Sequence, residues 1–331
     1  MNNIQILDCT LRDGGYVNNW EFSKNDSINI ISGIYSSGVR NIEIGILENG
    51  SKGNGTKFVN FEEIEPLLEN KKNDCKYAVM ATVNGMSEIN IPKRSSKTVD
   101  IVRLAFFKED LNSLIKLTQS TIEKGYDVFI QPMATFMYSD LELKELITEV
   151  NKLKPYAFYM VDSFSNLYPK DIRNMAEKIL DTLDENICFG LHAHNNMQMA
   201  FANVIEFMSL NTAHDLYVDG SIFGMGRGAG NVPTELLMEY LNKENSSYNA
   251  IEILKTYQRY LEPIYKKYGW GYSQPYYLTA TKSMNSVYGW YLLRNDITNI
   301  EKFNDILERI PEESKHKLNK NCVTDIINSL K

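Results

Sequence analysis

Two histidines in the second half of the chain are spaced as metal ligands at the end of a strand would be. His192 and His194 follow an apolar run at 187–191 and are separated only by Ala193. Residues i and i+2 of a strand point to the same side, so both imidazoles are expected to face one site. Packing rarely explains such a pair, because neutral rings need polar partners or a shared cation. The pair therefore predicts a metal site.

A carboxylate near the start of the chain completes a ligand set. Asp13 follows an apolar run at 4–11 and precedes Gly14 and Gly15. Glycines tolerate positive φ and close backbone approach, so they would let the chain turn and present both Arg12 and Asp13 to one site. Two nitrogens and one carboxylate leave positions open for water and a bidentate substrate. Such a set suits Mn²⁺, Fe²⁺, Co²⁺ or Zn²⁺, and Mg²⁺ less well.

Three further polar residues are expected around this metal, which would act as a Lewis acid on a chelated 2-oxo acid. Arg12 would stabilise the negative charge on an enolate oxygen, as the donors of an oxyanion hole do. A surface ion pair with Asp13 is the simpler interpretation of Arg12. Asn231 ends the glycine-rich segment 224–231 and could supply a fourth ligand, although such loops also form tight turns or phosphate cradles. Ser163 could donate a hydrogen bond to the substrate carboxylate.

These candidates lie where short apolar runs end. Eight such runs, taken as strands, alternate with helix-compatible segments at 4–11, 41–46, 77–81, 101–106, 127–131, 157–161, 187–191 and 216–218. Continuously apolar strands are typical of a parallel sheet covered on both faces. Their number predicts an α/β fold, a (β/α)₈ TIM barrel with its active site at the C-terminal ends of the strands. A doubly wound open sheet is the alternative.

The intervening helices and the end of the chain complete the predicted architecture. Helices are expected after a cap at Ser23 and at 61–69, 140–153 and 233–241, among others. We expect a catalytic barrel domain at 1–245 and a helical C-terminal region at 246–331, which either packs on the barrel or reaches a partner. The many tyrosines of that region are more typical of core or interface than of chemistry.

Composition limits the possible partners and surroundings. The formal net charge is −7 and there is no dense run of lysine and arginine, which argues against nucleic-acid binding. No stretch is long and apolar enough to span a bilayer. The four cysteines lack CxxC spacing, so free thiols in a reducing cytoplasm are expected. The sequence thus predicts a cytoplasmic enzyme that binds a small molecule.

Three motifs in this order resemble those of one superfamily. The chain reads D-C-T-L-R-D-G at 8–14, H-A-H at 192–194 and G-A-G-N at 228–231. This resembles the metal-dependent lyases with a D-x-T-L-R-D-G motif and an HxH pair, which include 3-hydroxy-3-methylglutaryl-CoA lyase, isopropylmalate and homocitrate synthases, and 4-hydroxy-2-oxovalerate aldolase. The resemblance implies Asp13, His192 and His194 as metal ligands and Arg12 as the enolate-stabilising residue.

Within that superfamily the chain is most similar to the aldolase. The aldolase carries a Gly-Tyr-x-x-x-Tyr pattern, which looks like residues 271–276 here and implies Tyr272 or Tyr276 as the acid. The aldolase also has a histidine shortly after the motif glycine, acting as general base. This chain has no histidine there. Tyr16 or a water on the metal would have to replace it, and a phenol with its ordinary pKa of about 10 is a poor base at neutral pH.

The resulting hypothesis is a divalent-metal-dependent aldolase. It would cleave a 4-hydroxy-2-oxo acid through a pyruvate-like enolate, giving a 2-oxo acid and an aldehyde, with Mn²⁺ as the expected metal and Mg²⁺, Co²⁺ or Zn²⁺ as alternatives. The runner-up is a Claisen-type condensing enzyme that uses an acyl-CoA. A third possibility is a non-catalytic scaffold that recruits an aldehyde dehydrogenase. We expect a homodimer, with an aldehyde dehydrogenase as a possible partner of the aldolase.

Overall fold

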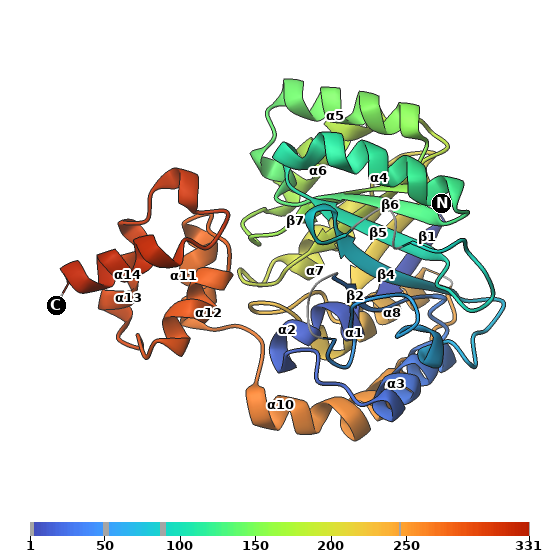
Figure 1. The fold of residues 1–331 in the computed structure, drawn as a ribbon, viewed down its shortest axis with the longest axis horizontal. Helices are drawn as coiled ribbons and strands as arrows, with labels where there is room; N and C mark the ends of the chain where they lie inside the picture. Colours follow the sequence, from blue (N-terminus) through green and yellow to red (C-terminus); the bar gives the residue numbers. More distant parts are fainter. Residues whose placement is uncertain (1–2, 49–52, 87–90, 245, 331) are drawn as a thin grey trace.

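Eight parallel strands close into a barrel in the computed structural model (Figure 1), which describes residues 3–48, 53–86, 91–244 and 246–330. The barrel strands are β1 (Ile4–Asp8), β2 (Asn41–Leu47), β4 (Lys76–Thr82), β5 (Ile101–Phe106), β6 (Asp127–Pro132), β7 (Ala157–Asp162), β8 (Cys188–Ala193) and β9 (Leu216–Gly220). The barrel is closed because β1 pairs with both β2 and β9, and a short strand, β3 (Lys57–Phe58), is added beside β2. The predicted TIM barrel is confirmed.

Helices cover the outside of this barrel. They are α3 (Lys24–Ser36), α4 (Leu111–Glu123), α5 (Asp140–Leu153), α6 (Pro169–Leu180), α7 (Ala200–Met208) and α8 (Thr234–Lys243). Ser23 caps α3 as predicted, because its side chain accepts a hydrogen bond from the N–H of Asp26 at 3.0 Å. The 140–153 helix is confirmed residue for residue. The helix expected at 233–241 begins one residue later, with Pro233 as its N-cap.

One predicted helix is wrong. Residues 61–69 contain only a short 3₁₀ turn, Glu65–Leu67. Pro66 has no N–H to donate to the carbonyl four residues earlier, so an α-helix cannot continue through it. The second unit of the barrel, between β2 and β4, therefore lacks a regular covering helix among its described residues.

The inside of the barrel is built in layers. An apolar cluster joins strands from all sides of the barrel and includes Leu7, Ala78, Ile101, Phe129 and Tyr217. Two residues further along β5 and β9, on the same inward side, stand Arg103 and Asp219, both buried. An apolar plug thus supports an ionic layer, and that layer lies nearer to the C-terminal ends of the strands. The candidate site is built on top of it.

The C-terminal residues are helical, as expected. After α9 (Ala250–Thr256), a π-helical turn (Tyr257–Leu261) and α10 (Glu262–Tyr268), the helices α11 (Gln274–Thr281), α12 (Val287–Arg294), α13 (Ile300–Glu308) and α14 (Lys320–Ser329) share an apolar cluster of their own. Figure 1 shows these last four helices, in orange and red, beside the barrel. Residue 245 lies outside the described residues, and the domain boundary there stays a prediction.

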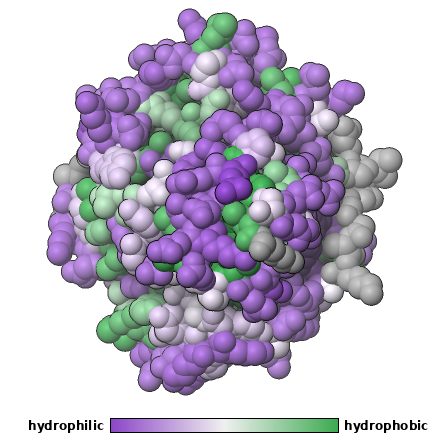
Figure 2. All heavy atoms as spheres, turned by 90° about the vertical axis from the view of Figure 1, so that its left-hand side faces the viewer, coloured by the Kyte–Doolittle hydropathy of each residue, from purple (hydrophilic) through white to green (hydrophobic). Residues whose placement is uncertain are grey.

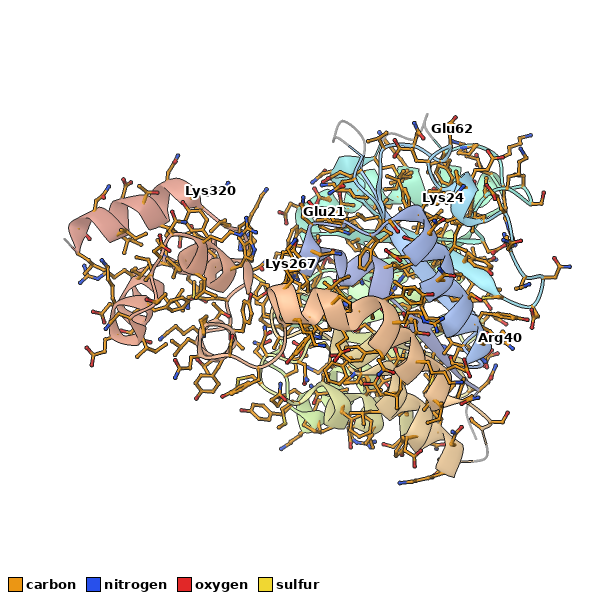
Figure 3. All side chains as sticks on the ribbon, turned by 90° about the horizontal axis from the view of Figure 1, so that it is seen from below. Glu21, Lys24, Arg40, Glu62, Lys267 and Lys320 are labelled. Atoms are coloured by element: carbon orange, nitrogen blue, oxygen red, sulfur yellow. The ribbon has the colours of Figure 1, made fainter. Side chains whose placement is uncertain are left out.

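Two parts of this helical region meet the barrel differently. α9 and α10 run along the barrel, so that Lys267 of α10 lies near Glu21, which follows the first strand and its turn (Figure 3). The last four helices instead touch loops that follow strands: Asn166 donates to Ser283 at 3.0 Å, and the rings of Phe107 and His316 are 6.1 Å apart. The region therefore stands against the C-terminal face of the barrel.

The surface on the side of the last four helices is mainly hydrophilic, with small, separate hydrophobic areas (Figure 2). Among the described residues, none of the helices has both the length and the apolar character needed to cross a membrane.

Candidate active site

The motif at the end of β1 forms a helical turn rather than an extended strand. The strand expected to reach residue 11 stops at Asp8, whose Oδ1 accepts a hydrogen bond from the N–H of Thr10 at 2.9 Å. The helix α1 (Thr10–Asp13) follows at once. Consecutive residues of a helix are about 100° apart rather than opposite, so Arg12 and Asp13 can contribute to the same site without a sharp turn after them.

Glycine is required at positions 14 and 15 because neighbouring atoms leave no room for a Cβ, and not because of an unusual φ angle. Gly14 is right-handed helical, and Gly15 begins the next short helix, α2 (Gly15–Asn18). A Cβ on Gly14 would overlap the carbonyl oxygen of Thr10, and one on Gly15 would overlap the ring of Trp20. Positive φ angles occur a few residues later, at Asn19 and Trp20. The expectation of positive φ at the glycines is therefore wrong, whereas close approach accounts for both.

The three predicted metal ligands come together. Asp13, His192 and His194 are all buried, and one ligand atom of each lies within 4.8 Å of the others. His192 belongs to β8 and His194 follows it, while β9 stands between β8 and β1 as the predicted barrel requires. The two imidazole rings are perpendicular, with centroids 4.8 Å apart. These buried side chains form a group that could hold a divalent metal.

Both imidazoles are held so that Nε2 is available. Nδ1 of His192 lies 2.8 Å from the carboxylate of Asp219, and Nδ1 of His194 lies 3.1 Å from the carbonyl oxygen of Asp162. Both partners are acceptors, so each Nδ1 carries the proton and each Nε2 keeps its lone pair. Nε2 of His194 is buried with no hydrogen-bond partner among the described residues. This is the arrangement that metal-ligating histidines require.

Asn231 offers the same kind of evidence for a cation. Its Nδ2 donates to Asp13 at 2.8 Å, which turns its Oδ1 in the other direction. That Oδ1 is buried and has no partner in the described part of the chain. A buried acceptor without a donor costs free energy unless something positive occupies the space beside it. The role of Asn231 as a fourth ligand stays a prediction, and the residues present fit a divalent cation.

The charge states of the ligands also suit a cation. Burial would raise the pKa of Asp13, but Arg12 and the nearby histidines hold it far below the usual range, so that the carboxylate is ionised. Burial, His192 and Arg227 lower the pKa of His194 to about 3, despite the opposing effect of Asp13. His194 is therefore neutral at physiological pH and its lone pair is free to bind metal.

Arg12 is buried and precisely oriented by two carboxylates, but one of its nitrogens is uncommitted. Its Nε donates to Glu43 at 2.7 Å, and its Nη1 pairs with Asp13. Nη2 is buried and makes no hydrogen bond with any described residue. The surface ion pair considered for Arg12 is thus wrong, since only 4% of the residue is exposed. A donor remains available beside the metal ligands.

Two charged residues below the site were not identified from the sequence. Arg103 is fully buried and pairs with both Glu43 and Asp219, and Asp219 in turn holds His192. Arg103 therefore links the residue that orients Arg12 to the residue that orients the candidate ligand His192. The sequence does mark both residues: Arg103 is the only charged residue of the apolar strand β5, and Asp219 is the only one of β9. A lone charge in a buried strand must find a partner.

The other predicted site residues, Ser163, Tyr272 and Tyr276, differ in burial and in what they contact. Ser163 follows β7 and is buried, and its Oγ accepts a hydrogen bond from the N–H of Ala134 at 2.8 Å. Tyr272 is 59% exposed. Tyr276, in α11, lies against Gly289 of α12. Neither tyrosine has a hydrogen bond or a ring contact with the metal-ligand group among the described residues, and their catalytic roles stay predictions, as does that of Ser163.

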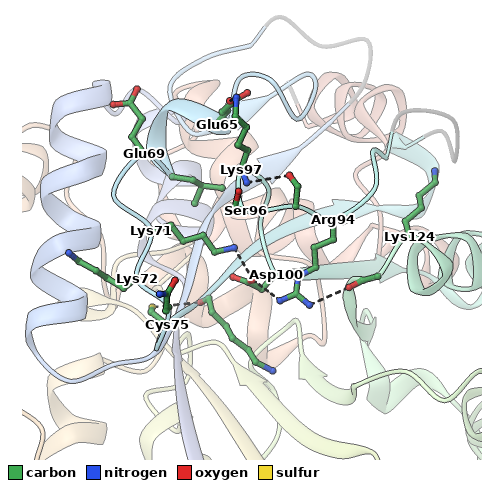
Figure 4. Close-up of a pocket in the computed structure, with 15 residues that line it drawn as sticks. Glu65, Glu69, Lys71, Lys72, Cys75, Arg94, Ser96, Lys97, Asp100 and Lys124 are labelled. Atoms are coloured by element: carbon green, nitrogen blue, oxygen red, sulfur yellow. Dashed lines mark hydrogen bonds and ion pairs between the residues drawn. The ribbon is translucent and has the colours of Figure 1, made fainter.

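One pocket lies away from this group. A cavity of about 1050 Å³ is lined by residues from the starts of β4 and β5, at the end of the barrel opposite the metal ligands (Figure 4). Its walls carry several lysines, but Lys71 and Arg94 both donate to Oδ1 of Asp100 at 2.8 Å. These positive charges are already paired, so the cavity has no concentration of unpaired charge comparable to the buried ligand group.

Comparison with known proteins agrees with this geometry. The chain is 25% identical over 240 residues to an oxaloacetate decarboxylase of Mycobacterium tuberculosis, covering 72% of this chain and 70% of that protein. It is 26% identical over 249 residues to a 4-hydroxy-2-oxovalerate aldolase of Bacillus cereus, with the same shares covered. The N-terminal domain of a candidate aldolase from Bacteroides vulgatus superposes with a TM-score of 0.77 at 26% identity, over 90% of this chain and 99% of that chain. The HMGL-like family model matches residues 3–258, and the chain belongs to this family.

Proposed function

We propose that this protein is a divalent-metal-dependent aldolase that cleaves a 4-hydroxy-2-oxo acid to a 2-oxo acid and an aldehyde. One observation carries the proposal: buried acceptors on His194 and Asn231 without partners lie in the same site as an uncommitted donor on Arg12. A cation and an oxyanion would satisfy these groups together. The relative named 4-hydroxy-2-oxovalerate aldolase supports this choice of substrate class.

The chemistry assigns a task to each group. A divalent cation held by Asp13, His192, His194 and Asn231 would supply Lewis-acid polarisation of a carbonyl. Cleavage breaks the bond between C3 and C4. Its electron pair forms a double bond between C2 and C3, and the π pair of the C2 carbonyl moves onto the oxygen to give an enolate. Arg12 Nη2 would donate to the oxygen on which that charge develops. The proton leaves the 4-hydroxyl, and C3 later gains one.

Decarboxylation of a 2-oxo diacid is a second candidate, and the distribution of histidines favours it. Loss of CO₂ from C3 gives the same enolate but requires no base for a hydroxyl proton. Of the two other histidines, His214 contacts the carbonyl of Ile187 before β8 and His316 packs on Phe107 after β5, and neither makes a hydrogen bond to the ligand group among the described residues. The relative named oxaloacetate decarboxylase is consistent with this chemistry.

Metal analysis combined with enolisation of pyruvate tests the common part of both reactions. The Mn²⁺-loaded protein is expected to exchange the C3 hydrogens of pyruvate with deuterium, and His192→Ala is expected to lose both metal and exchange. Absence of bound metal and of exchange in the wild type, even with added Mn²⁺, would reject the proposal. Turnover of 4-hydroxy-2-oxopentanoate against oxaloacetate then separates the two candidates, and thiol release from acetyl-CoA tests the condensing alternative.

The cellular setting belongs to the proposal as well. All four cysteines are free, which supports the predicted cytoplasmic location. A homodimer, and an aldehyde dehydrogenase that accepts the released aldehyde, stay predictions. Sedimentation of the purified protein, alone and mixed with such a dehydrogenase, tests both.

A further inference from the structure

A second arginine stands at the candidate site. Arg227 belongs to the loop between β9 and α8, and its N–H donates to Oδ2 of the metal ligand Asp13 at 3.1 Å. A Cβ on the preceding residue, Gly226, would come within 2.5 Å of that same oxygen. The loop therefore packs directly on Asp13. The main chain of Arg227 is therefore fixed beside the metal-ligand group, which keeps the base of its side chain close to that group.

The side chain of Arg227 has an aromatic support but no anionic partner. Its guanidinium lies over the ring of Tyr16, 5.4 Å from the ring centroid, and Tyr16 in turn packs edge-on against Trp20 at 4.7 Å. No carboxylate of the described residues lies within ion-pairing distance, and Nε is buried without a hydrogen bond. Lys57 also lies over an aromatic ring here, that of Trp20, but unlike Arg227 it forms an ion pair, with Glu48.

The contrast with Arg12 shows what this arrangement can do. Arg12 is neutralised by Glu43 and Asp13 and is almost fully buried. Arg227 is partly exposed, and no ion pair joins its guanidinium to Asp13, which already accepts hydrogen bonds from Arg12, from Asn231 and from the Arg227 main chain. In a protein of net charge −7, an unpaired guanidinium beside the ligand group is a local positive centre. A planar donor held over a ring suits a carboxylate or a phosphate.

We propose that Arg227 binds a second anionic group of the substrate, on the aldehyde half beyond C4, so that the enzyme prefers 4-hydroxy-2-oxo acids whose aldehyde product is itself an acid. The inference rests on the proposed function, which places the 2-oxo acid end at the metal ligands. Carboxylate and phosphate share the chemistry that this arginine recognises. Arg227 also lowers the pKa of both Asp13 and His194, which agrees with its position close to them.

Binding of matched 2-oxo acids tests the proposal without requiring turnover. The Mn²⁺-loaded protein is titrated calorimetrically with 2-oxoglutarate and 2-oxoadipate, and with the monoacids 2-oxopentanoate and 2-oxohexanoate. At least one diacid is expected to bind about 10-fold to 100-fold more tightly than its monoacid, the range of a charge-assisted hydrogen bond. Arg227→Gln should remove this preference, so that diacid and monoacid bind with similar affinity, and Arg227→Lys should retain part of it.

A matched control and a phosphonate complete the design. Arg294→Gln removes an arginine that also lies over an aromatic ring, that of Trp290 at 4.6 Å, but outside the site, and it should keep the diacid preference. Titration with 2-oxo-4-phosphonobutanoate, which carries a phosphonate in place of the second carboxylate of 2-oxoglutarate, shows whether the preferred anion is a carboxylate or a phosphate. The preferred ligand of these two should bind more tightly to the wild type, and this difference should be absent in Arg227→Gln.

The outcomes separate this inference from the proposed function. Equal affinity for diacids and monoacids in the wild type would overturn the role of Arg227, and so would an Arg227→Gln variant that weakens both classes equally. Loss of pyruvate exchange in the wild type would instead reject the proposed function. A diacid preference that depends on Arg227, found without such exchange, would support anion binding by Arg227 and reject only the proposed reaction.

Discussion

Asp219 accepts a hydrogen bond from Nδ1 of His192 at 2.8 Å and is itself paired with the fully buried Arg103. Burial would raise the pKa of Asp219, but Arg103 and His192 together lower it, so the carboxylate is ionised beneath the metal-ligand group. The relationship fixes both the tautomer and the direction of one ligand. It makes Asp219 a positioning residue for the candidate ligand His192.

Replacing Asp219 should therefore weaken metal binding. Asp219→Asn is expected to raise the dissociation constant for Mn²⁺ by about 10-fold to 100-fold, as changes to the hydrogen-bond partners of ligating histidines do. Calorimetric titration of Mn²⁺ measures this directly. Asp215→Asn changes an exposed carboxylate just before the same strand and should have no effect. An unchanged affinity in Asp219→Asn would mean that His192 is oriented by other contacts.

Arg12 should affect the reaction and not the metal. Arg12→Ala is expected to retain bound Mn²⁺ but to slow C3 exchange of pyruvate by about 10²-fold to 10³-fold, because it removes the donor for the oxyanion. Glu43 keeps its pairing with Arg103 in this variant, which limits damage to the fold. Metal content and exchange rate are measured on the same sample. Exchange at the wild-type rate would remove Arg12 from the mechanism.

The packing of Gly15 on Trp20 should be costly to disturb. A Cβ at Gly15 would overlap the indole ring, whose Nε1 donates to the carbonyl oxygen of Arg12 at 3.0 Å. Gly15→Ala is expected to lower the free energy of unfolding by about 1–3 kcal/mol, the usual range for overpacking. Urea unfolding measures the loss.

A double variant serves as the control for this clash. Trp20→Leu makes space for the new methyl group, so Gly15→Ala should cost less in that background than in the wild type, and the two effects should not add. Additive effects would show that the ring is not the obstacle.

Asp8 should give the protein a measurable pH dependence. Burial raises the pKa of Asp8 to about 6, above its ordinary value of 3.8, despite hydrogen bonds from Thr10 and Thr234. The folded state then holds its proton more tightly than the unfolded state, so the stability contributed by Asp8 is complete below pH 3.8 and is lost as the pH rises through 6.

Asp8→Asn removes this titration. Between pH 5 and pH 7.5 the stability of the wild type relative to Asp8→Asn should fall by roughly 1 kcal/mol, as one pKa unit corresponds to about 1.4 kcal/mol. Urea unfolding of both proteins at the two pH values gives the difference. A constant difference would show that Asp8 does not titrate in this range.

The sequence alone was sufficient for the barrel and for the three residues that gather into the candidate metal site. Strand number follows from apolar runs, which are local, and ligand types follow from residue chemistry at the ends of those runs. Apolar runs did not predict the local structure of the motif at 8–14, where we expected a strand to residue 11 and the helix α1 forms instead. The hydrogen bond from the Thr10 N–H to Asp8 begins that helix, and hydropathy does not register such a bond.

Only the tertiary structure decided what supports those ligands. The pair of Arg103 and Asp219 joins residues 116 positions apart, and Arg227 reaches Asp13 across 214 positions. Such contacts exist because barrel closure brings β1, β5, β8 and β9 around one axis, and no periodicity along the chain encodes which charges then meet. The same closure leaves Arg227 without a carboxylate. Local sequence determined the chemistry that is available here, and the closed barrel determined which groups are paired and which remain for a substrate.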